Sequence, residues 1–518
     1  MTLHAPDAPD APDAPDAQTG PPHAIGPTET ELAAAIAAYR AALPPGSLHL
    51  FDIAPLDRLG LSVFAAGFVG DDGFLQDGFG YGANAAEATV GALGEISETA
   101  HLDRALRTAP VTLASYRDLV AAHGAGAVLD PLTLCLPAGS DWTPETPLAW
   151  VGVRRWPDGA AGLAPLECIA TAPSQHRARA DGAARLFRPI TCGLGAGLSP
   201  AQALSHAVLE LLQRDGNCTT FRAMDEGHVL DLSDLGDPGL LALLDRLAAA
   251  GITPIAKLAS TEFGLSNIYV VGRGGAAALP IMLTACGEAV HPNPVRALRK
   301  ALLEFIAARC RKAFMHGPLA PIRAVAGDAY LDGYAARFDL SAEEPRALAE
   351  MTRWLALDAD ELLSGLAETV FAARRTTRLA ELPSAPDARV AEPAARMADV
   401  SGRLAGADIP VWYFDASPAE GGGVHVVKAI APGLEGETMS YYRLGARGAA
   451  RLLERDVAFV GRTPRGRARR VRMPGAAEAR LGGPVYLDTD AVDRVVGAAY
   501  PLYREPSSHA VQFGLGRR

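Results

Sequence analysis

The pattern of apolar and polar positions predicts a chain in which strands and helices alternate. Short runs rich in branched and aromatic residues are typical of buried strands, and longer Ala/Leu-rich segments with a helical period are typical of helices. The expected strands are 61–69, 148–155, 266–273, 280–285 and 423–431. The expected helices are 86–106, 200–215, 239–251 and 294–313. This mixture predicts a mixed α/β fold and excludes an all-α or all-β one.

The N-terminal residues 1–28 are expected to lie outside the folded domain as a disordered tract. Residues 5–17 repeat Ala-Pro-Asp, which offers no apolar face to bury and favours extended, polyproline-like geometry. Thr28 and Glu31 have the spacing of a capping box, so the first helix is expected to begin there. It is expected to end before Pro44.

No linker is visible along most of the chain. We therefore interpret residues 29–450 as one domain and residues 451–518 as a less regular C-terminal extension. The extension contains an Arg-rich loop at 462–472, with six arginines in eleven residues. The loop is either a solvated segment or a surface that an acidic leader peptide or a phosphate approaches.

Composition narrows the class of protein. The chain has 518 residues, 49% of them hydrophobic, and a net charge of −11, which argues against a nucleic-acid-binding protein. Its six cysteines include no Cys-x-x-Cys pair, which excludes a zinc ribbon or a thioredoxin-type site. No apolar run is long enough to span a membrane, and no signal peptide is evident. We expect a cytoplasmic protein that contacts neither membrane nor nucleic acid.

A short pattern is repeated along the chain. It consists of Ala-x3-Ala-x2-Glu, and in two copies the glutamate follows a Gly-x-Gly turn by thirteen residues. The copies are Gly80, Gly82, Ala88, Ala92 and Glu95; Gly195, Gly197, Ala203, Ala207 and Glu210; and Ala297, Ala301 and Glu304.

The spacing places each alanine pair and its glutamate on one face of a helix. A small-residue face lets backbones approach closely, so the glutamate is expected to be carried into the interior. A buried carboxylate is costly unless it is paired or bound to a metal. Three such glutamates suit Mg²⁺, and the Gly-rich turns offer N–H groups to an anion. The alternative is that these glutamates are solvated helix residues in an Ala-rich chain.

These segments resemble the YcaO family of ATP-dependent enzymes that activate backbone amides in peptides. Residues 191–215, TCGLGAGLSPAQALSHAVLELLQRD, are similar to the family's Gly-x-x-Ala-Gly…Ala…Glu-x-x-Glu-Arg-Asp segment. The resemblance covers about residues 45–450 and implies internally repeated strand, Gly-rich turn and helix units around a site for ATP and Mg²⁺. The other matching segments are 51–66, 80–98, 291–311 and 426–436.

Carried over position by position, the resemblance implies a nucleotide site. Arg214 and Lys300 match basic positions and are expected to stabilise the charge of the transferring phosphoryl group as catalytic residues. The expected Mg²⁺ ligands are Glu95, Glu98, Glu210 and Glu304. The expected ATP-binding residues are Gly80, Gly82, Glu95, Glu98, Gly195, Gly197, Glu210, Gln213, Arg214, Lys300 and Glu304.

The implied activity is ATP- and Mg²⁺-dependent phosphorylation of a backbone amide in a ribosomally made precursor peptide. The attacking nucleophile is a Cys, Ser or Thr side chain, sulfide or an amine, so the product is an azoline, a thioamide or a related group. A separate leader-binding or TfuA/ThiF-type partner is implied, and a homodimer is compatible with the sequence.

The alternative is a catalytically inactive YcaO-like scaffold within a peptide-modifying complex. It is motivated by positions that depart from the family pattern and remove polar contacts. These positions are Tyr81, Gly91, Thr99, Leu198 and Gln213.

Overall fold

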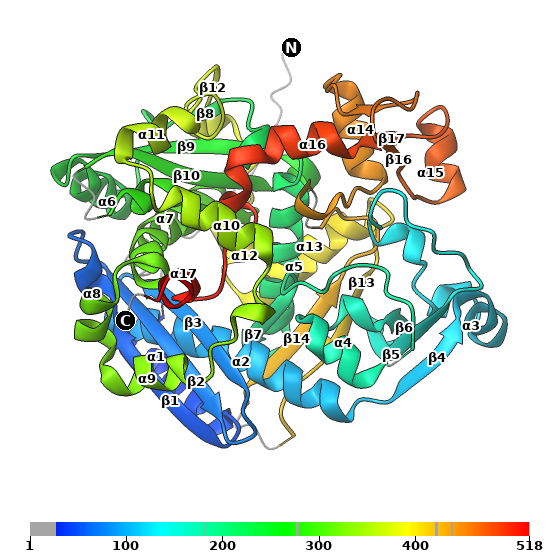
Figure 1. The fold of residues 1–518 in the computed structure, drawn as a ribbon, viewed down its shortest axis with the longest axis horizontal. Helices are drawn as coiled ribbons and strands as arrows, with labels where there is room; N and C mark the ends of the chain where they lie inside the picture. Colours follow the sequence, from blue (N-terminus) through cyan, green and yellow to red (C-terminus); the bar gives the residue numbers. More distant parts are fainter. Residues whose placement is uncertain (1–26, 181, 276–278, 420–422, 437–438, 517–518) are drawn as a thin grey trace, which may run out of the picture.

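The computed structural model describes residues 27–516, except 181, 276–278, 420–422 and 437–438. The predicted disordered tract, with its Ala-Pro-Asp repeats at 5–17, therefore lies outside the described residues apart from 27 and 28. Strands and helices alternate through the rest of the chain, which confirms the mixed α/β fold (Figure 1).

Four sheets organise the described residues. The first has the antiparallel order β1-β2-β3, with β1 Gly46–Asp52, β2 Ser62–Gly70 and β3 Leu75–Gly82. The second has the order β11-β10-β9-β8-β12, with β8 His228–Asp231, β9 Ile252–Ser260, β10 Ser266–Gly274, β11 Gly287–His291 and β12 Arg375–Arg378. The third has the order β4-β5-β13-β14-β7, with β6 beside β5; the strands are β4 Val111–Ser115, β5 Pro147–Trp156, β6 Ala161–Pro165, β7 Leu194–Gly197, β13 Val411–Asp415 and β14 His425–Ile430. The fourth joins β15 Val460–Gly461, β17 Tyr486–Asp488 and β16 Ala468–Arg470.

Helices cover these sheets and connect them. In chain order they are α1 Glu29–Ala42, α2 Ala85–Thr108, α3 Tyr116–His123, α4 Pro173–Arg179, α5 Pro200–Asn217, α6 Pro238–Ala249, α7 Pro294–His316, α8 Leu319–Ala326, α9 Asp328–Ala335, α10 Pro345–Trp354, α11 Ala359–Gly365, α12 Asp387–Val390, α13 Pro393–Ala405, α14 Ala446–Glu454, α15 Gly475–Arg480, α16 Thr489–Val496 and α17 Ala510–Gly514. None of these described helices is both long and apolar enough to cross a bilayer.

Most of the predicted elements are present. The capping box at Thr28 and Glu31 opens α1, and the four long predicted helices correspond to α2, α5, α6 and α7. The strand predicted at 280–285 is wrong, because Pro280–Thr284 is a 3₁₀ helix. Pro280 lacks the N–H that a strand would donate, and the residues that follow are buried without the alternation of a half-exposed strand.

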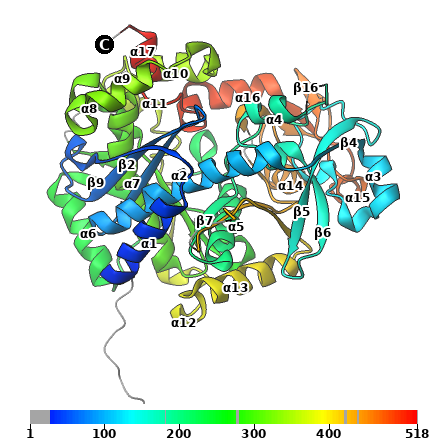
Figure 2. The same ribbon diagram turned by 90° about the horizontal axis from the view of Figure 1, so that it is seen from below.

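The repeated pattern corresponds to three strand–helix units: β3–α2, β7–α5 and β11–α7. Each helix packs on the strand of its own unit and also touches the strand of the next, α2 with β7, α5 with β11 and α7 with β3. The units therefore close into a ring, and Figure 2 shows α2 extending from the first sheet towards the third. The alanines of the pattern are fully buried at these contacts: Ala88, Ala92, Ala203, Ala207, Ala297 and Ala301.

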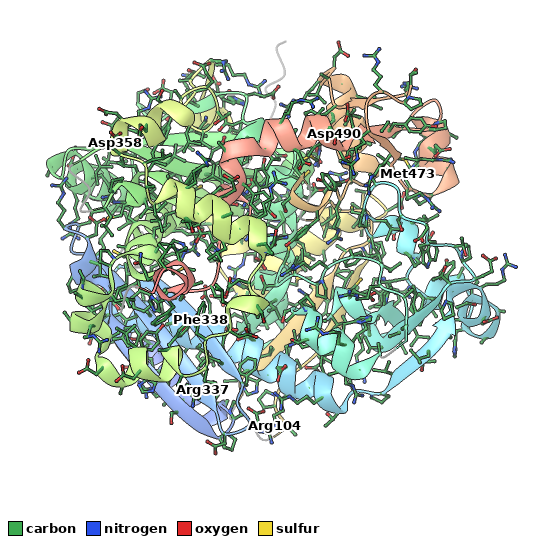
Figure 3. All side chains as sticks on the ribbon, in the orientation of Figure 1. Arg104, Arg337, Phe338, Asp358, Met473 and Asp490 are labelled. Atoms are coloured by element: carbon green, nitrogen blue, oxygen red, sulfur yellow. The ribbon has the colours of Figure 1, made fainter. Side chains whose placement is uncertain are left out.

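The fourth sheet, α14 and α16 share a hydrophobic core that also includes Ala138, Met224 and Ala347 from earlier in the chain. The predicted boundary at residue 450 falls inside α14. Several arginines of the Arg-rich loop are held locally: Arg470 pairs with Glu478 at 2.8 Å, and Arg467 lies 3.3 Å from Asp490, which is labelled in Figure 3. These ion pairs anchor part of the Arg-rich loop within the C-terminal region.

Candidate nucleotide and metal site

Each unit turns one helix glutamate onto the strand that precedes it. A backbone N–H in the strand, or just before the strand in the second unit, donates a hydrogen bond to the carboxylate, so one oxygen is fixed against the sheet. The bonds join Phe79 N to Glu95 at 2.6 Å, Gly193 N to Glu210 at 2.9 Å, and Glu288 N to Glu304 at 3.0 Å. The three carboxylates are thus held by similar bonds, although the donor in the second unit lies one residue further from its glutamate.

A cavity of about 350 Å³ lies where the three helices meet. It collects all four predicted glutamates and the predicted cations, from all three units of the ring. Its polar lining is Gln76, Asp77, Tyr81, Glu95, Glu98, Thr99, Thr191, His206, Glu210, Gln213, Arg214, Lys300, Glu304 and Arg311. The fold thus brings polar and charged side chains from three distant segments of the chain to one cavity.

The cavity carboxylates repel one another and are partly withdrawn from water. Burial, together with the neighbouring Glu95 and Glu210, raises the pKa of Glu98 to about 8. Burial likewise raises the pKa of Glu95 to about 7 and that of Glu304 to about 7. Because the ionised form of these carboxylates is disfavoured, a cation placed among them would stabilise it.

Three cations face these acids. Arg214 lies 3.4 Å from Glu210 and 3.5 Å from Glu288, and Lys300 is exposed at the cavity wall. Arg311 also lines the cavity, and it was not among the predicted residues. It follows Glu304 by seven residues and so shares the same face of α7, which is the spacing that would have revealed it.

Glu288 is an acidic residue beside the cavity that the sequence pattern did not indicate. It begins the third unit on β11, and its carboxylate accepts hydrogen bonds from Gln213 and Asn217 of α5. Arg222 lies 3.4 Å from it, and Arg214 and Arg222 together hold its pKa below the ordinary value although burial alone would raise it. A carboxylate from β11 thus lies beside Gln213, where the family pattern places an acid on α5.

The four predicted glycines do not line the cavity. A Cβ on Gly80 would overlap the Ala88 carbonyl oxygen, and one on Gly195 would overlap that of Ala203. Nearby strand N–H groups are taken by side chains of the protein: the Ala196 N–H donates to Glu98 at 3.0 Å. Gly80, Gly82, Gly195 and Gly197 therefore permit close contact between strand and helix, and their role in ATP binding stays a prediction.

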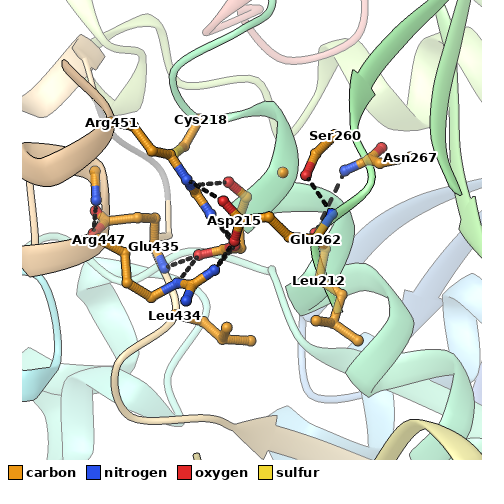
Figure 4. Close-up of polar contacts among 12 residues, drawn as sticks. Leu212, Asp215, Cys218, Ser260, Glu262, Asn267, Leu434, Glu435, Arg447 and Arg451 are labelled. Carbon is orange, nitrogen blue, oxygen red and sulfur yellow. Dashed lines mark hydrogen bonds and ion pairs between the residues drawn. The ribbon is translucent and has the colours of Figure 1, made fainter. Parts of the chain in front are cut away.

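Asp215 follows Arg214 but faces away from the cavity. Figure 4 shows it between Arg447 and Arg451 of α14, at 3.2 and 2.6 Å. The Glu435 N–H donates to the same carboxylate at 2.8 Å. This buried network ties the C-terminal region to the end of the helix that carries Glu210.

The residues present fit Mg²⁺ carried on a nucleotide. Among the described residues, no cluster of three or more His, Cys, Asp or Glu side chains is close enough to enclose a metal ion. Mg²⁺ usually keeps several waters and takes one or two carboxylates together with substrate phosphates. Carboxylates spaced round a cavity, with Arg214, Lys300 and Arg311 opposite, suit that mode of binding.

Residues 79–435 match the family model described as YcaO cyclodehydratase, ATP- and Mg²⁺-binding. The chain belongs to the YcaO family. ATP and Mg²⁺ are the cofactors of this family, and the matched range contains the helices α2, α5 and α7 and every residue of the predicted site.

Two relatives are similar to this chain in sequence. An uncharacterized protein of Methanothermobacter thermautotrophicus is 27% identical over 57% of this chain and 72% of its own length. A protein of Rhizobium leguminosarum bv. trifolii, described as lying in the tfuA 3′ region, is 25% identical over 38% of this chain and 46% of its own length.

Two solved structures share the fold. A YcaO protein from Methanopyrus kandleri, solved with AMPPCP and Mg²⁺, superposes with a TM-score of 0.52 at 17% identity, covering 79% of this chain and 91% of its own. A heterocyclase solved with substrate and cofactor gives a TM-score of 0.55 at 14% identity, covering 81% of this chain and 54% of its own. This chain thus spans about half of the heterocyclase.

Proposed function

We propose that this YcaO protein uses ATP and Mg²⁺ to activate a backbone amide of a ribosomally made peptide for post-translational modification. The observation that carries the proposal is the convergence of Glu95, Glu210 and Glu304 on one cavity, opposite Arg214 and Arg311. Family membership supplies the nucleotide and the metal, and the heterocyclase with the same fold supports a peptide as substrate.

In the proposed reaction a nucleophile adds to the amide carbonyl carbon, and the carbonyl oxygen becomes an oxyanion. When bound, ATP would supply the γ-phosphoryl group that this oxygen accepts, with release of ADP, and Mg²⁺ would neutralise phosphate charge; the oxygen later departs with the phosphoryl group as phosphate. Arg214 and Arg311 neutralise charge that develops on the transferring group, since preorganised cations act most strongly where water is scarce. Lys300 contributes as a point charge at the more exposed wall.

Glu95, Glu98, Glu210 and Glu304 are proposed to hold Mg²⁺ through its waters or directly, and Glu210 also lies 3.4 Å from Arg214. The raised pKa values of Glu95, Glu98 and Glu304 mean that protons leave when the metal arrives. The product is proposed to be an azoline, a thioamide or a related group, according to the nucleophile.

A partner protein is part of the proposal. The rhizobial relative described by its position beside tfuA supports a separate TfuA-type partner. We expect activity when this chain is coexpressed with the product of a neighbouring tfuA-like gene and with a candidate precursor peptide.

The test measures phosphate release and the mass of the peptide after incubation with Mg²⁺–ATP. Loss of one water indicates a cyclodehydration, and exchange of oxygen for sulfur indicates a thioamide. Glu210→Gln should abolish both phosphate release and the mass change, while Glu454→Gln, an exposed residue on α14, should preserve them. An unchanged mass with wild-type protein, or full biological output from Glu210→Gln, would favour the scaffold alternative.

A further inference from the structure

A second, larger cleft lies beside the nucleotide cavity. Its volume is about 980 Å³, and its walls come from segments 171–177, 185–191 and 341–347, with residues 504–507 and Tyr441 completing it. Thr191 lines both the cleft and the nucleotide cavity. The two spaces therefore adjoin at the segment that leads into Gly193 and its bond to Glu210.

A second connection runs through α7. Arg311 lines the nucleotide cavity, and the next residue, Lys312, pairs at 2.5 Å with Glu505, which lines the cleft. A molecule in the cleft would thus extend towards the place where phosphoryl transfer is proposed.

The acidic groups of the cleft are already engaged by the protein. Glu505 is held by Lys312 and His316, and Glu343 accepts a hydrogen bond from the Ser507 N–H at 3.0 Å. Glu344 accepts from the hydroxyl groups of Tyr441 and Tyr500. Lys312 balances the charge of Glu505, so the four arginines of the cleft face two further glutamates, Glu343 and Glu344.

Among the described residues, the arginines of the cleft have few counter-ions. Arg177 and Arg185 are exposed and form no ion pair or hydrogen bond through their side chains with any described residue. Arg188 reaches only one carboxylate, at 3.9 Å. In a chain of net charge −11, a cleft with several unbalanced arginines concentrates positive potential at one place.

Arg504 is the most enclosed of these cations. Its guanidinium stacks on Tyr441 at 4.4 Å from the ring centre, and its Nε and Nη2 atoms are buried without a hydrogen-bond partner among the described residues. No carboxylate of the described residues lies within ion-pair distance of it. A guanidinium withdrawn from water without a counter-ion is costly, so an incoming carboxylate would be stabilised.

We infer that this cleft binds the peptide substrate through carboxylates, with Arg504, Arg188 and Arg185 selecting an acidic segment near the amide to be modified. The inference rests on the proposed function and specifies its substrate class. The carboxylate belongs to an Asp or Glu side chain or to the peptide C-terminus, and both present the same planar group to an arginine.

The test is fluorescence anisotropy with the full chain, without ATP, on three labelled peptides of equal length. One probe contains two internal glutamates and an amidated end, one is neutral with a free C-terminal carboxylate, and one is neutral and amidated. At low salt we expect one or both acidic probes to bind at least about tenfold more tightly than the neutral amidated probe, and salt to reduce the difference. The tighter acidic probe identifies the source of the carboxylate.

Arg504→Gln should weaken binding of the acidic probe about tenfold. Arg185→Gln should weaken it about threefold, and because Arg185 is exposed this change carries little risk to folding. Arg480→Gln, an exposed change of the same charge on α15, should leave binding unchanged. The inference would be overturned if all three probes bound equally, or if Arg480→Gln weakened binding as much as Arg504→Gln. It would also be overturned if inorganic phosphate displaced the acidic probe as readily as the unlabelled acidic peptide does.

The Mg²⁺–ATP thermal shift of the same proteins separates the two proposals. A shift that persists while the acidic probes fail to bind contradicts only the charged cleft. The absence of a shift in the wild type contradicts the proposed function itself.

Discussion

At the scale of single residues, the site is a balance between carboxylates that resist ionisation and cations that favour it. Glu98 is the clearest case, because its side chain is only 15% exposed and burial with nearby acids raises its pKa to about 8. Glu95 is more open to solvent, and Arg311 opposes its shift. The acids are therefore prepared to exchange protons for a metal ion.

The pKa of Glu98 predicts how stability depends on pH in the absence of ligand. Its value in the fold lies above the ordinary 4.5, so the folded state keeps a proton that the unfolded chain releases. The resulting stability is fully present below pH 4.5 and is lost as pH rises through about 8. Glu98→Gln removes this titration, so its melting temperature should fall less than that of the wild type between about pH 4.5 and pH 8.

Thermal unfolding at a series of pH values, without Mg²⁺, measures this difference. Glu454→Gln, exposed on α14, should retain the wild-type dependence. Identical curves for wild type and Glu98→Gln would show that Glu98 is ionised freely in the fold.

The residues of the site were predictable to different degrees, for physical reasons. Glu95, Glu210 and Glu304 share a helical spacing with small residues, and that spacing is visible in the chain. Glu288 was not predictable, because its place depends on how β11 meets α5 of another unit. The orientation of Asp215 towards α14, instead of towards Arg214, likewise depends on a contact between distant segments.

At the scale of secondary-structure elements, the glycines and alanines determine how closely each helix approaches its strand. The sequence predicted the helices well, since their caps and apolar faces are local features. It did not indicate how tightly the glycines of the Gly-x-Gly turns pack on the helices, because an exposed N–H and a tightly packed glycine have the same sequence pattern.

Gly80→Ala should destabilise the protein, because its Cβ would overlap the backbone of α2 at Ala88. Overpacking of this kind costs about 1–3 kcal/mol. Gly94→Ala is the matched control, since Gly94 lies on α2 with open space around its missing Cβ. That control should stabilise the protein by about 0.5–1 kcal/mol through helix propensity.

Urea denaturation followed by circular dichroism gives both values. If Gly80→Ala were neutral while Gly94→Ala behaved as expected, the close packing of β3 on α2 would not be needed for stability.

At the scale of the whole molecule, the C-terminal segment returns across the fold to the ring of three units. Figure 1 shows the chain running from α16 to α17 over the middle of the molecule. Glu505 pairs there with Lys312 of α7, and the His509 N–H donates to the Met315 carbonyl at 2.7 Å. Lys312 is 3% exposed, so its charge depends on Glu505.

Glu505→Gln should therefore destabilise the protein by about 3 kcal/mol, because removing one partner leaves a buried charge unpaired. The control is Asp328→Asn, which breaks the exposed contact between Arg323 and Asp328 and should change stability by less than about 1 kcal/mol. Both are measured by chemical denaturation. Equal small effects would mean that the C-terminal segment is not anchored through Glu505.

The central claim is that three helix glutamates and their opposing cations bind Mg²⁺ and ATP together. The most direct measurement is the thermal-unfolding shift with Mg²⁺ and ATP, each alone and combined, for wild type, Glu210→Gln and Glu454→Gln. Ligand at about a hundred times its dissociation constant stabilises by about 2.7 kcal/mol, a shift of a few degrees at most in a chain this long. We predict a shift that needs both ligands, is lost in Glu210→Gln and persists in Glu454→Gln. A wild type without a shift, or a Glu210→Gln variant with the full shift, would contradict the account.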